Sequence, residues 1–197
     1  MARAREAAGA PEHFSRSQGI YASCLLWCLV EPAGASPRGD ALGGRVRVVF
    51  VRHGERGAGG ADPDLTAAGR RMSRETGQWL ARQGVRPDLA LSTPTARTRQ
   101  TLDELLSVLG PVPVEVRLDL PESPYDWDAL VDPLRAALGD AATLMLVGHH
   151  PTLHFLADAY GPPPIPVPRH HLAAALILRP ANAGWRCEAA WPGRAGQ

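Results

Sequence analysis

Four residues with side chains suited to phosphate chemistry follow segments that have the pattern of buried strands. Arg52 and His53 end the first of these, RVRVVFV (45–51), and His149 directly follows TLMLVG (143–148). Arg97 lies a few residues after a third, PDLALST (87–93). A guanidinium group binds phosphate oxygens through parallel N–H donors, and a neutral imidazole is a competent nucleophile near neutral pH. These residue types predict a site that binds a phosphoryl dianion and can accept it on a histidine.

Strand-like and helix-like segments alternate along the chain, which predicts an α/β fold. Besides the three strands above, Pro113 marks the strand at 112–118 as an edge strand, and Pro94 is expected in the first turn of its helix. The alternation indicates a three-layer α/β/α sandwich with a mostly parallel central sheet. The remaining expected elements are helices at 66–84, 94–110, 125–138 and 151–161, and two joined strands within 171–180 and 184–191.

The carboxyl ends of parallel strands lie at one edge of a sheet, and ligands bind there. We therefore expect Arg52, His53, Arg97 and His149 to converge at that edge. The first turn of the helix after Pro94 is expected to add backbone N–H donors and the positive end of a helix dipole. Because no carboxylate cluster suited to magnesium is visible, we expect neither a metal nor a cofactor.

Composition favours one globular domain and excludes several classes of partner. The chain has 197 residues, 45% hydrophobic residues and a formal net charge of +1, so no strong overall field attracts nucleic acid or an anionic membrane. Its three cysteines are too few for a disulfide framework. We expect a catalytic domain over residues 45–192, a tail over 193–197, no nucleic-acid partner and no stable membrane association.

The N-terminal segment allows two interpretations. Residues 1–44 contain several arginines, the short apolar run IYASCLLWCLV (20–30) and a Gly/Pro-rich stretch. One interpretation is a poorly ordered extension of a cytoplasmic protein. The other is a signal peptide within residues 1–35, with export to the periplasm or beyond. The length of the leading segment and the polar residues in the apolar run favour the first interpretation.

Four blocks of sequence resemble the histidine phosphatase superfamily, also called phosphoglycerate mutase-like. They are, in order, VRHGE, LTAAG, STPTARTRQT and LVGHHP, within residues 46 to about 190. The resemblance implies that His53 is a nucleophile that becomes phosphohistidine, and that Arg52, Arg97 and His149 bind the phosphoryl group. The third block departs from the family pattern, since Thr93 is inserted before Pro94 and Thr98 replaces the usual alanine.

The interval between Arg97 and His149 has room for only one strand and one helix. The chain therefore resembles the short, cap-less branch that includes bacterial phosphohistidine phosphatases. A mutase is disfavoured, because the short interval leaves little to hold a second phosphate. An open site of this kind admits a phosphorylated protein side chain as well as a small phosphate ester.

The proton donor is the least defined part of the site. An alkoxide leaving group needs a proton, whereas a phosphorylated imidazole leaves more easily. Asp119 and Glu122 follow the third strand, and Glu122 is the preferred candidate. His150 and His154 suggest a metal site only if residue 150 is helical, which Pro151 opposes.

The sequence thus predicts a metal-independent phosphatase that acts through a phosphohistidine on His53, most like a phosphohistidine protein phosphatase. Two alternatives remain open. One is a phosphomonoesterase for sugar phosphates or other small molecules. The other is a phosphate-binding module that has lost turnover.

Overall fold

The computed structural model describes residues 47–117, 127–139, 142–160, 166–181 and 184–196, all within one structural unit, Asp40–Gln197. The predicted N-terminal segment, residues 1–44, lies outside the described residues. The elements, in chain order, are β1 (Arg47–Arg52), α2 (Ala67–Arg82), β2 (Leu89–Ser92), α3 (Ala96–Leu109), β3 (Val114–Val116), α4 (Trp127–Leu138), β4 (Thr143–Gly148), α5 (His150–Ala159), β5 (His171–Leu172), β6 (Ala175–Ala181), β7 (Gly184–Trp191) and β8 (Arg194–Ala195).

The central sheet has six strands in the order β3-β2-β4-β1-β6-β7. The pairs β3–β2, β2–β4 and β4–β1 are parallel, whereas β1–β6 and β6–β7 are antiparallel. The expected mostly parallel sheet is therefore confirmed, and β3 is at the edge as Pro113 predicts. Since β2, β4 and β1 are parallel neighbours, the segments that follow them leave the same edge of the sheet.

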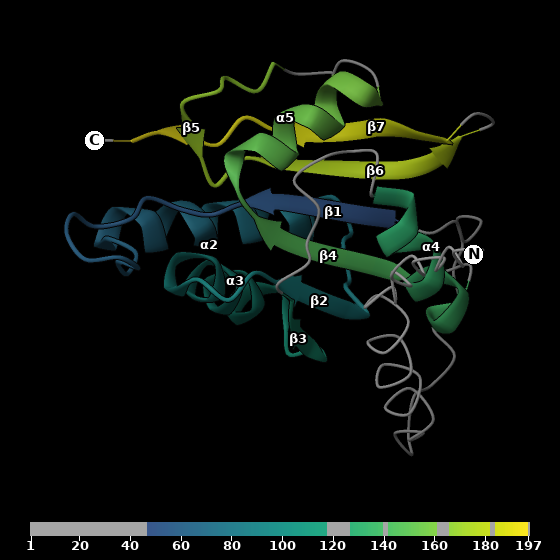
Figure 1. Ribbon diagram of the computed structural model, residues 1–197, viewed down its shortest axis with the longest axis horizontal. Helices are drawn as coiled ribbons and strands as arrows, with labels where there is room; N and C mark the ends of the chain where they lie inside the picture. The colour runs from purple at the N-terminus through teal and green to yellow at the C-terminus, as the bar shows by residue number, and fades with distance from the viewer. Residues whose placement is uncertain (1–46, 118–126, 140–141, 161–165, 182–183, 197) are drawn as a thin grey trace, which may run out of the picture. The chain divides into compact units, whose positions relative to one another are not determined.

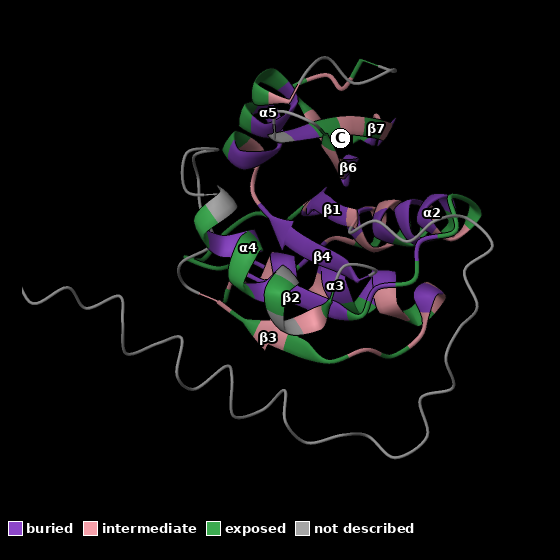
Figure 2. Ribbon diagram, turned by 90° about the vertical axis from the view of Figure 1, so that its right-hand side faces the viewer, coloured by how far each residue is buried: buried purple, intermediate pink, exposed green. Residues whose placement is uncertain are grey.

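Helices cover both faces of this sheet. Helices α2 and α3 lie on one face, and α4 and α5 lie on the other (Figures 1 and 2). This arrangement gives the three layers predicted from the alternation of elements. It leaves the carboxyl ends of the parallel strands free of helical cover and available to a site.

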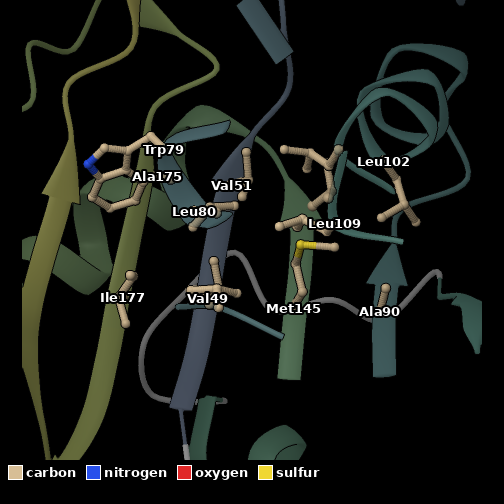
Figure 3. Packing of buried hydrophobic residues seen from close by; sticks show 13 residues of the cluster. Val49, Val51, Trp79, Leu80, Ala90, Leu102, Leu109, Met145, Ala175 and Ile177 are labelled. Atoms are coloured by element: carbon tan, nitrogen blue, oxygen red, sulfur yellow. The ribbon is translucent and has the colours of Figure 1, made fainter. Parts of the chain in front are cut away.

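The core between the sheet and α2/α3 comes from alternate residues of the strands (Figure 3). Val49 and Val51 of β1 and Met145 of β4 point to this face and meet Trp79 of α2 and Leu105 of α3. The intervening strand residues are buried as well. Both faces of β1 and β4 are thus covered, which explains why these strands read as continuous apolar runs rather than alternating ones.

Two helix starts differ from their predicted positions. Helix α3 begins at Ala96 with Thr95 as its N-cap, so Pro94 precedes the helix instead of occupying its first turn. Helix α5 begins at His150, with His149 as the N-cap. Pro151 was expected to keep residue 150 out of the helix, but a proline is tolerated within the first turn because its missing N–H would have no intrahelical partner.

The C-terminal segment contains more order than the predicted tail. Residues Arg194–Ala195 form β8, which pairs with β5 in a separate two-stranded sheet. Ala173 separates β5 from β6 and has a left-handed backbone (φ 52°), which an alanine adopts at a cost of about 1 kcal/mol. In the part of the chain described here, no helix is long and apolar enough to cross a membrane.

Candidate active site

The backbone of His53 is held from both sides at the carboxyl end of β1. Its N–H donates to the carbonyl oxygen of Gly148 (3.0 Å), and its own carbonyl accepts from the N–H of Ala173 (3.1 Å). The hydroxyl of Thr76 in turn donates to the carbonyl of Ala173 (2.7 Å). His53 is therefore fixed between β4 and the segment that leads into β6, as a group that must act with defined geometry requires.

The imidazole of His53 is buried and carries its hydrogen on Nδ1. Nδ1 lies 2.7 Å from the carbonyl oxygen of Gly54. A carbonyl only accepts, so Nδ1 must be the donor, and Nε2 keeps its lone pair. Burial, and to a smaller extent the charges of His149, Arg97 and Arg52, lower the pKa of His53 to about 4. The ring is therefore neutral at neutral pH and keeps a lone pair on Nε2.

Two glycines bring the first two sequence blocks into contact. A Cβ on Gly54 would lie 2.6 Å from the carbonyl oxygen of Gly69, and a Cβ on Gly69 would overlap the carbonyl oxygen of Glu55. Only glycines allow the loop after β1 to approach the first turn of α2 this closely. Thr66 caps α2 through the N–H of Gly69 and donates its hydroxyl to the carboxylate of Glu55. Glu55 therefore has a structural partner in this loop.

The third block also supports the loop that carries His53. The N–H of Gly54 donates to Oγ1 of Thr101 (2.9 Å), and this hydroxyl donates to the carbonyl of Arg97 (2.7 Å). Thr101 lies on α3 and is fully buried. The contact fixes the loop after β1 against the same helix turn that presents Arg97.

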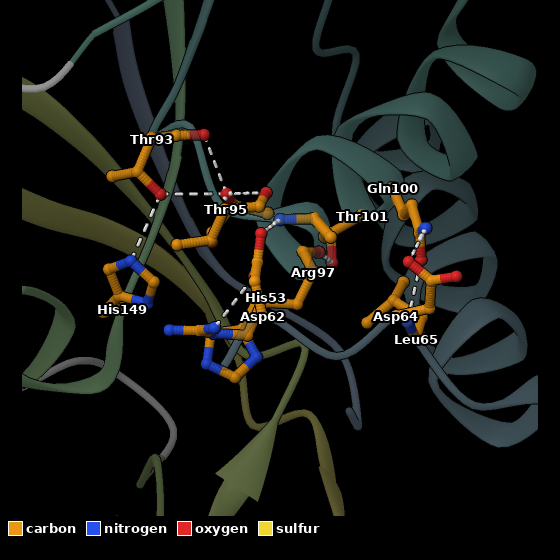
Figure 4. A network of polar contacts seen from close by, with 12 residues as sticks. His53, Asp62, Asp64, Leu65, Thr93, Thr95, Arg97, Gln100, Thr101 and His149 are labelled. Carbon is orange, nitrogen blue, oxygen red and sulfur yellow. Dashed lines mark hydrogen bonds and ion pairs between the residues drawn. The ribbon is translucent and has the colours of Figure 1, made fainter. Parts of the chain in front are cut away.

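Arg97, the second residue of α3, meets a carboxylate that the sequence analysis did not identify. Its guanidinium nitrogen lies 3.4 Å from Oδ1 of Asp62, and the N–H of Ala96 donates to Oδ2 of the same side chain (2.8 Å) (Figure 4). The N–H of Ala96, expected as a phosphate donor, is therefore occupied by Asp62. The sequence offered no specific signal for this contact, since an aspartate in a Gly-rich loop is ordinary turn chemistry.

His149 lies beside His53, as expected from the ends of β4 and β1. The two ring centroids are 5.5 Å apart, and the ring planes meet at 67°. Nε2 of His149 lies 3.1 Å from Oγ1 of Thr93, a residue that the sequence analysis noted only as an insertion (Figure 4). An edge-on imidazole next to His53 can donate to an anion bound between the two rings.

Arg52 supports the far side of the site. One terminal nitrogen donates to the carbonyl oxygens of Arg169 (2.7 Å) and His171 (2.6 Å), and burial lowers the pKa of its guanidinium. Within the described part of the chain, its Nε is buried without a hydrogen-bond partner. A buried unpaired donor is costly in a folded protein, so an acceptor beside this nitrogen would stabilise it.

The other predicted candidates lie outside this arrangement. Asp119 and Glu122 are outside the described residues. His150 and His154 do share a face of α5, with ring centroids 4.5 Å apart, and the ring nitrogens of His154 face the carbonyl oxygens of His150 and Val167. Among the described residues, no group of three or more His, Cys, Asp or Glu side chains is arranged to hold a metal ion.

Comparisons with known proteins agree with this geometry. The family described as the histidine phosphatase superfamily (branch 1) matches residues 48–143. A 2,3-bisphosphoglycerate-dependent phosphoglycerate mutase from Nitrobacter hamburgensis is 34% identical over 90 residues, which cover 42% of this chain and 44% of that protein. The match thus spans about half the length of the curated relative.

Solved structures show the same fold over most of the described chain. The protein histidine phosphatase SixA, in a complex with tungstate, has 26% identity, a TM-score of 0.57 and coverage of 73% of this chain and 95% of that one. SixA from Nakamurella multipartitia has 26% identity, a TM-score of 0.56 and coverage of 77% and 98%. The matched family, the shared fold and the four sequence blocks at one sheet edge agree: residues 48–143 of the chain belong to the histidine phosphatase superfamily, branch 1.

Proposed function

We propose that this chain is a metal-independent phosphatase that forms a covalent phosphohistidine on Nε2 of His53. One observation carries the proposal: a buried, neutral imidazole presents Nε2 next to His149, with two arginines close enough for their charges to lower its pKa. The similarity to SixA, which was solved as a complex with tungstate, supports the proposal, because tungstate is a tetrahedral oxyanion like phosphate.

The first chemical step forms a bond between Nε2 and phosphorus. The lone pair of Nε2 attacks, and the bond to the leaving group breaks with its electron pair remaining on that group. Attack makes the imidazole positive, and the bond from Nδ1–H to the carbonyl of Gly54 stabilises that charge. Arg52, Arg97 and His149 stabilise the charge on the equatorial phosphoryl oxygens. Water then attacks phosphorus, and Nε2 leaves with its lone pair restored.

The leaving group distinguishes the substrate classes. An alkoxide needs a proton, which Glu122 would supply, whereas a phosphorylated imidazole needs less assistance. We propose a phosphohistidine side chain of a protein as the substrate, since the chain resembles SixA and has a short interval between α3 and β4. A small phosphate ester is the second candidate, favoured by the similarity to a phosphoglycerate mutase.

The test is chemical trapping of the phosphoenzyme. Labelled substrate should leave acid-labile, base-stable phosphate on His53, and a His53→Ala variant should lose both the label and turnover. His170→Ala is a matched control, because His170 is an exposed histidine with no role in the proposed mechanism. Hydrolysis of p-nitrophenyl phosphate retained in the His53→Ala variant would overturn the mechanism.

A substrate panel then separates the alternatives. Phosphohistidine protein, sugar phosphates and nucleotides are compared by kcat/KM with the same enzyme preparation. A preference for phosphohistidine protein supports the first candidate, and a preference for a small ester supports the second. Phosphate binding without label or turnover on any substrate would identify a binding module instead.

A further inference from the structure

The two departures from the family pattern, Thr93 and Thr98, are hydrogen-bonded to each other, and Thr93 also contacts His149 (Figure 4). Thr98 is fully buried in the first turns of α3. Its hydroxyl lies 2.9 Å from the carbonyl oxygens of both Thr93 and Thr95 and 2.8 Å from Oγ1 of Thr95. All three oxygens can accept, so the single proton of the Thr98 hydroxyl is committed to one of them.

This commitment sets the direction of the next hydrogen bond. Oγ1 of Thr93 lies 2.8 Å from Oγ1 of Thr98, which can only accept from it. The proton of the Thr93 hydroxyl is thereby used as well. Nε2 of His149 lies 3.1 Å from Oγ1 of Thr93, which therefore offers it only a lone pair. A lone pair there requires a hydrogen on Nε2.

We propose that Thr98 and Thr93 form a hydroxyl relay that fixes His149 as the Nε2–H tautomer. The inference rests on the proposed function only for its catalytic consequence, namely that a phosphoryl dianion beside His149 meets a ring whose Nε2–H is held by Thr93. Thr93 and Thr98 are positioning residues, since they act through His149.

The relay is tested first by a measurement that does not depend on activity. At alkaline pH, where imidazoles are neutral, two-bond ¹H–¹⁵N NMR spectra distinguish the two tautomers of His149, assigned by loss of its signals in His149→Gln. The full chain should show the Nε2–H tautomer. Predominance of Nδ1–H in the unmodified protein would overturn the relay whatever the enzyme does.

Two isosteric substitutions, Thr98→Val and Thr93→Val, distinguish the presence of the Thr93–His149 hydrogen bond from the direction in which its hydrogen is donated. Thr98→Val removes the acceptor, so Thr93 can donate to Nε2, and His149 should show a mixture of tautomers. Thr93→Val removes the contact, while Thr93→Ser retains it and should restore the Nε2–H signal if the protein folds as before. An unchanged tautomer in Thr98→Val would contradict the proposal.

Enzyme activity, measured as kcat/KM, is the second test of the relay. We expect kcat/KM to fall about tenfold in Thr93→Val, roughly the effect of one hydrogen bond, and to stay within about twofold in Thr93→Ser. Thr143→Val makes the same exchange of hydroxyl for methyl at the opposite end of β4. It should change neither the tautomer of His149 nor kcat/KM. If no substrate is turned over, the proposed function fails, yet the NMR spectra still decide whether the relay exists.

Discussion

Nδ1 of His53 and the carbonyl oxygen of Gly54 are hydrogen-bonded at 2.7 Å, and His53 as a whole is 9% exposed. This contact fixes the tautomer, and burial fixes the charge. Both effects act on the same ring, so Nε2 keeps a lone pair without prior loss of a proton to solvent. The consequences can be measured separately.

The first prediction concerns the titration of His53. Burial lowers its pKa to about 4, so its ring resonances should not shift between neutral pH and roughly pH 5. ¹H–¹³C NMR of the histidine ring protons tests this, with the His53 signal assigned by its absence in His53→Gln. A midpoint near the ordinary value of 6.5 would show that the ring is more hydrated than the structure indicates.

The second prediction links this titration to stability. The unfolded chain binds a proton at His53 below pH 6.5, and the folded chain does so only near pH 4. Stability contributed by the neutral ring is thus complete above pH 6.5 and falls by about 3 kcal/mol as the pH drops to 4. Urea unfolding of the wild type and His53→Gln at both pH values isolates this residue. Equal losses in the two proteins would contradict the prediction.

The third prediction concerns the close approach of the loop after β1 to α2. Ala at Gly69 would overlap the backbone of Glu55, so Gly69→Ala should cost about 3 kcal/mol in unfolding free energy. Gly57→Ala is the control, because its Cβ would lie 3.5 Å from the nearest atom, the carbonyl oxygen of Asp64. A Gly69→Ala variant as stable as the control would show that the loop moves freely.

The fourth prediction concerns the ion pairs that join α2 to α3. Glu104 is buried and contacts Arg70 (3.2 Å) and Arg74 (2.6 Å). Both arginines are partly exposed, so Glu104→Ala should cost about 2 kcal/mol, less than the loss of a fully buried pair. Asp103→Ala, at an exposed position one residue earlier, should change the unfolding free energy by less than about 0.5 kcal/mol.

The fold was predictable where the pattern of side chains leaves one structural solution. The apolar run 143–148 coincides with β4, since a run of six apolar residues is too short for a typical helix and fits a strand covered on both faces. Helix starts were harder, because Pro94 and Thr95 both favour a helix N-terminus and differ in which position they occupy. Thr95 takes the N-cap and moves the first turn of α3 by two residues.

Contacts between residues far apart in the chain depend on tertiary structure, so the sequence contains weaker signals for them. Arg52 and His53 could be found because they lie at the carboxyl end of a strand-like run, and His149 and Arg97 because they come directly or shortly after one. Asp62 follows no strand, and its partners Ala96 and Arg97 are more than thirty residues away. The contact of Asp62 with α3 depends on how the Gly-rich loop lies against that helix, which local sequence preferences do not encode.

The fifth prediction concerns Asp62 as an anion that already occupies part of the site. Its carboxylate binds the first N–H of α3 and the guanidinium of Arg97, which are both groups that would otherwise face a phosphoryl oxygen. At an assumed separation of about 6 Å, one negative charge would repel a dianion by roughly 0.7 kcal/mol per unit charge in water-like surroundings. Asp62→Asn should therefore bind inorganic phosphate about threefold more tightly or better.

Asparagine still offers an oxygen to the N–H of Ala96, so α3 should retain its capping contact, whereas Asp62→Ala loses it and should be about 1 kcal/mol less stable. Isothermal titration with phosphate measures the affinity, and urea unfolding measures the cap. Asp64→Asn is the matched control, because Asp64 lies in the same loop but contacts Gln100 instead of Arg97. Weaker phosphate binding in Asp62→Asn would mean that the carboxylate orients Arg97 for the substrate more than it competes with it.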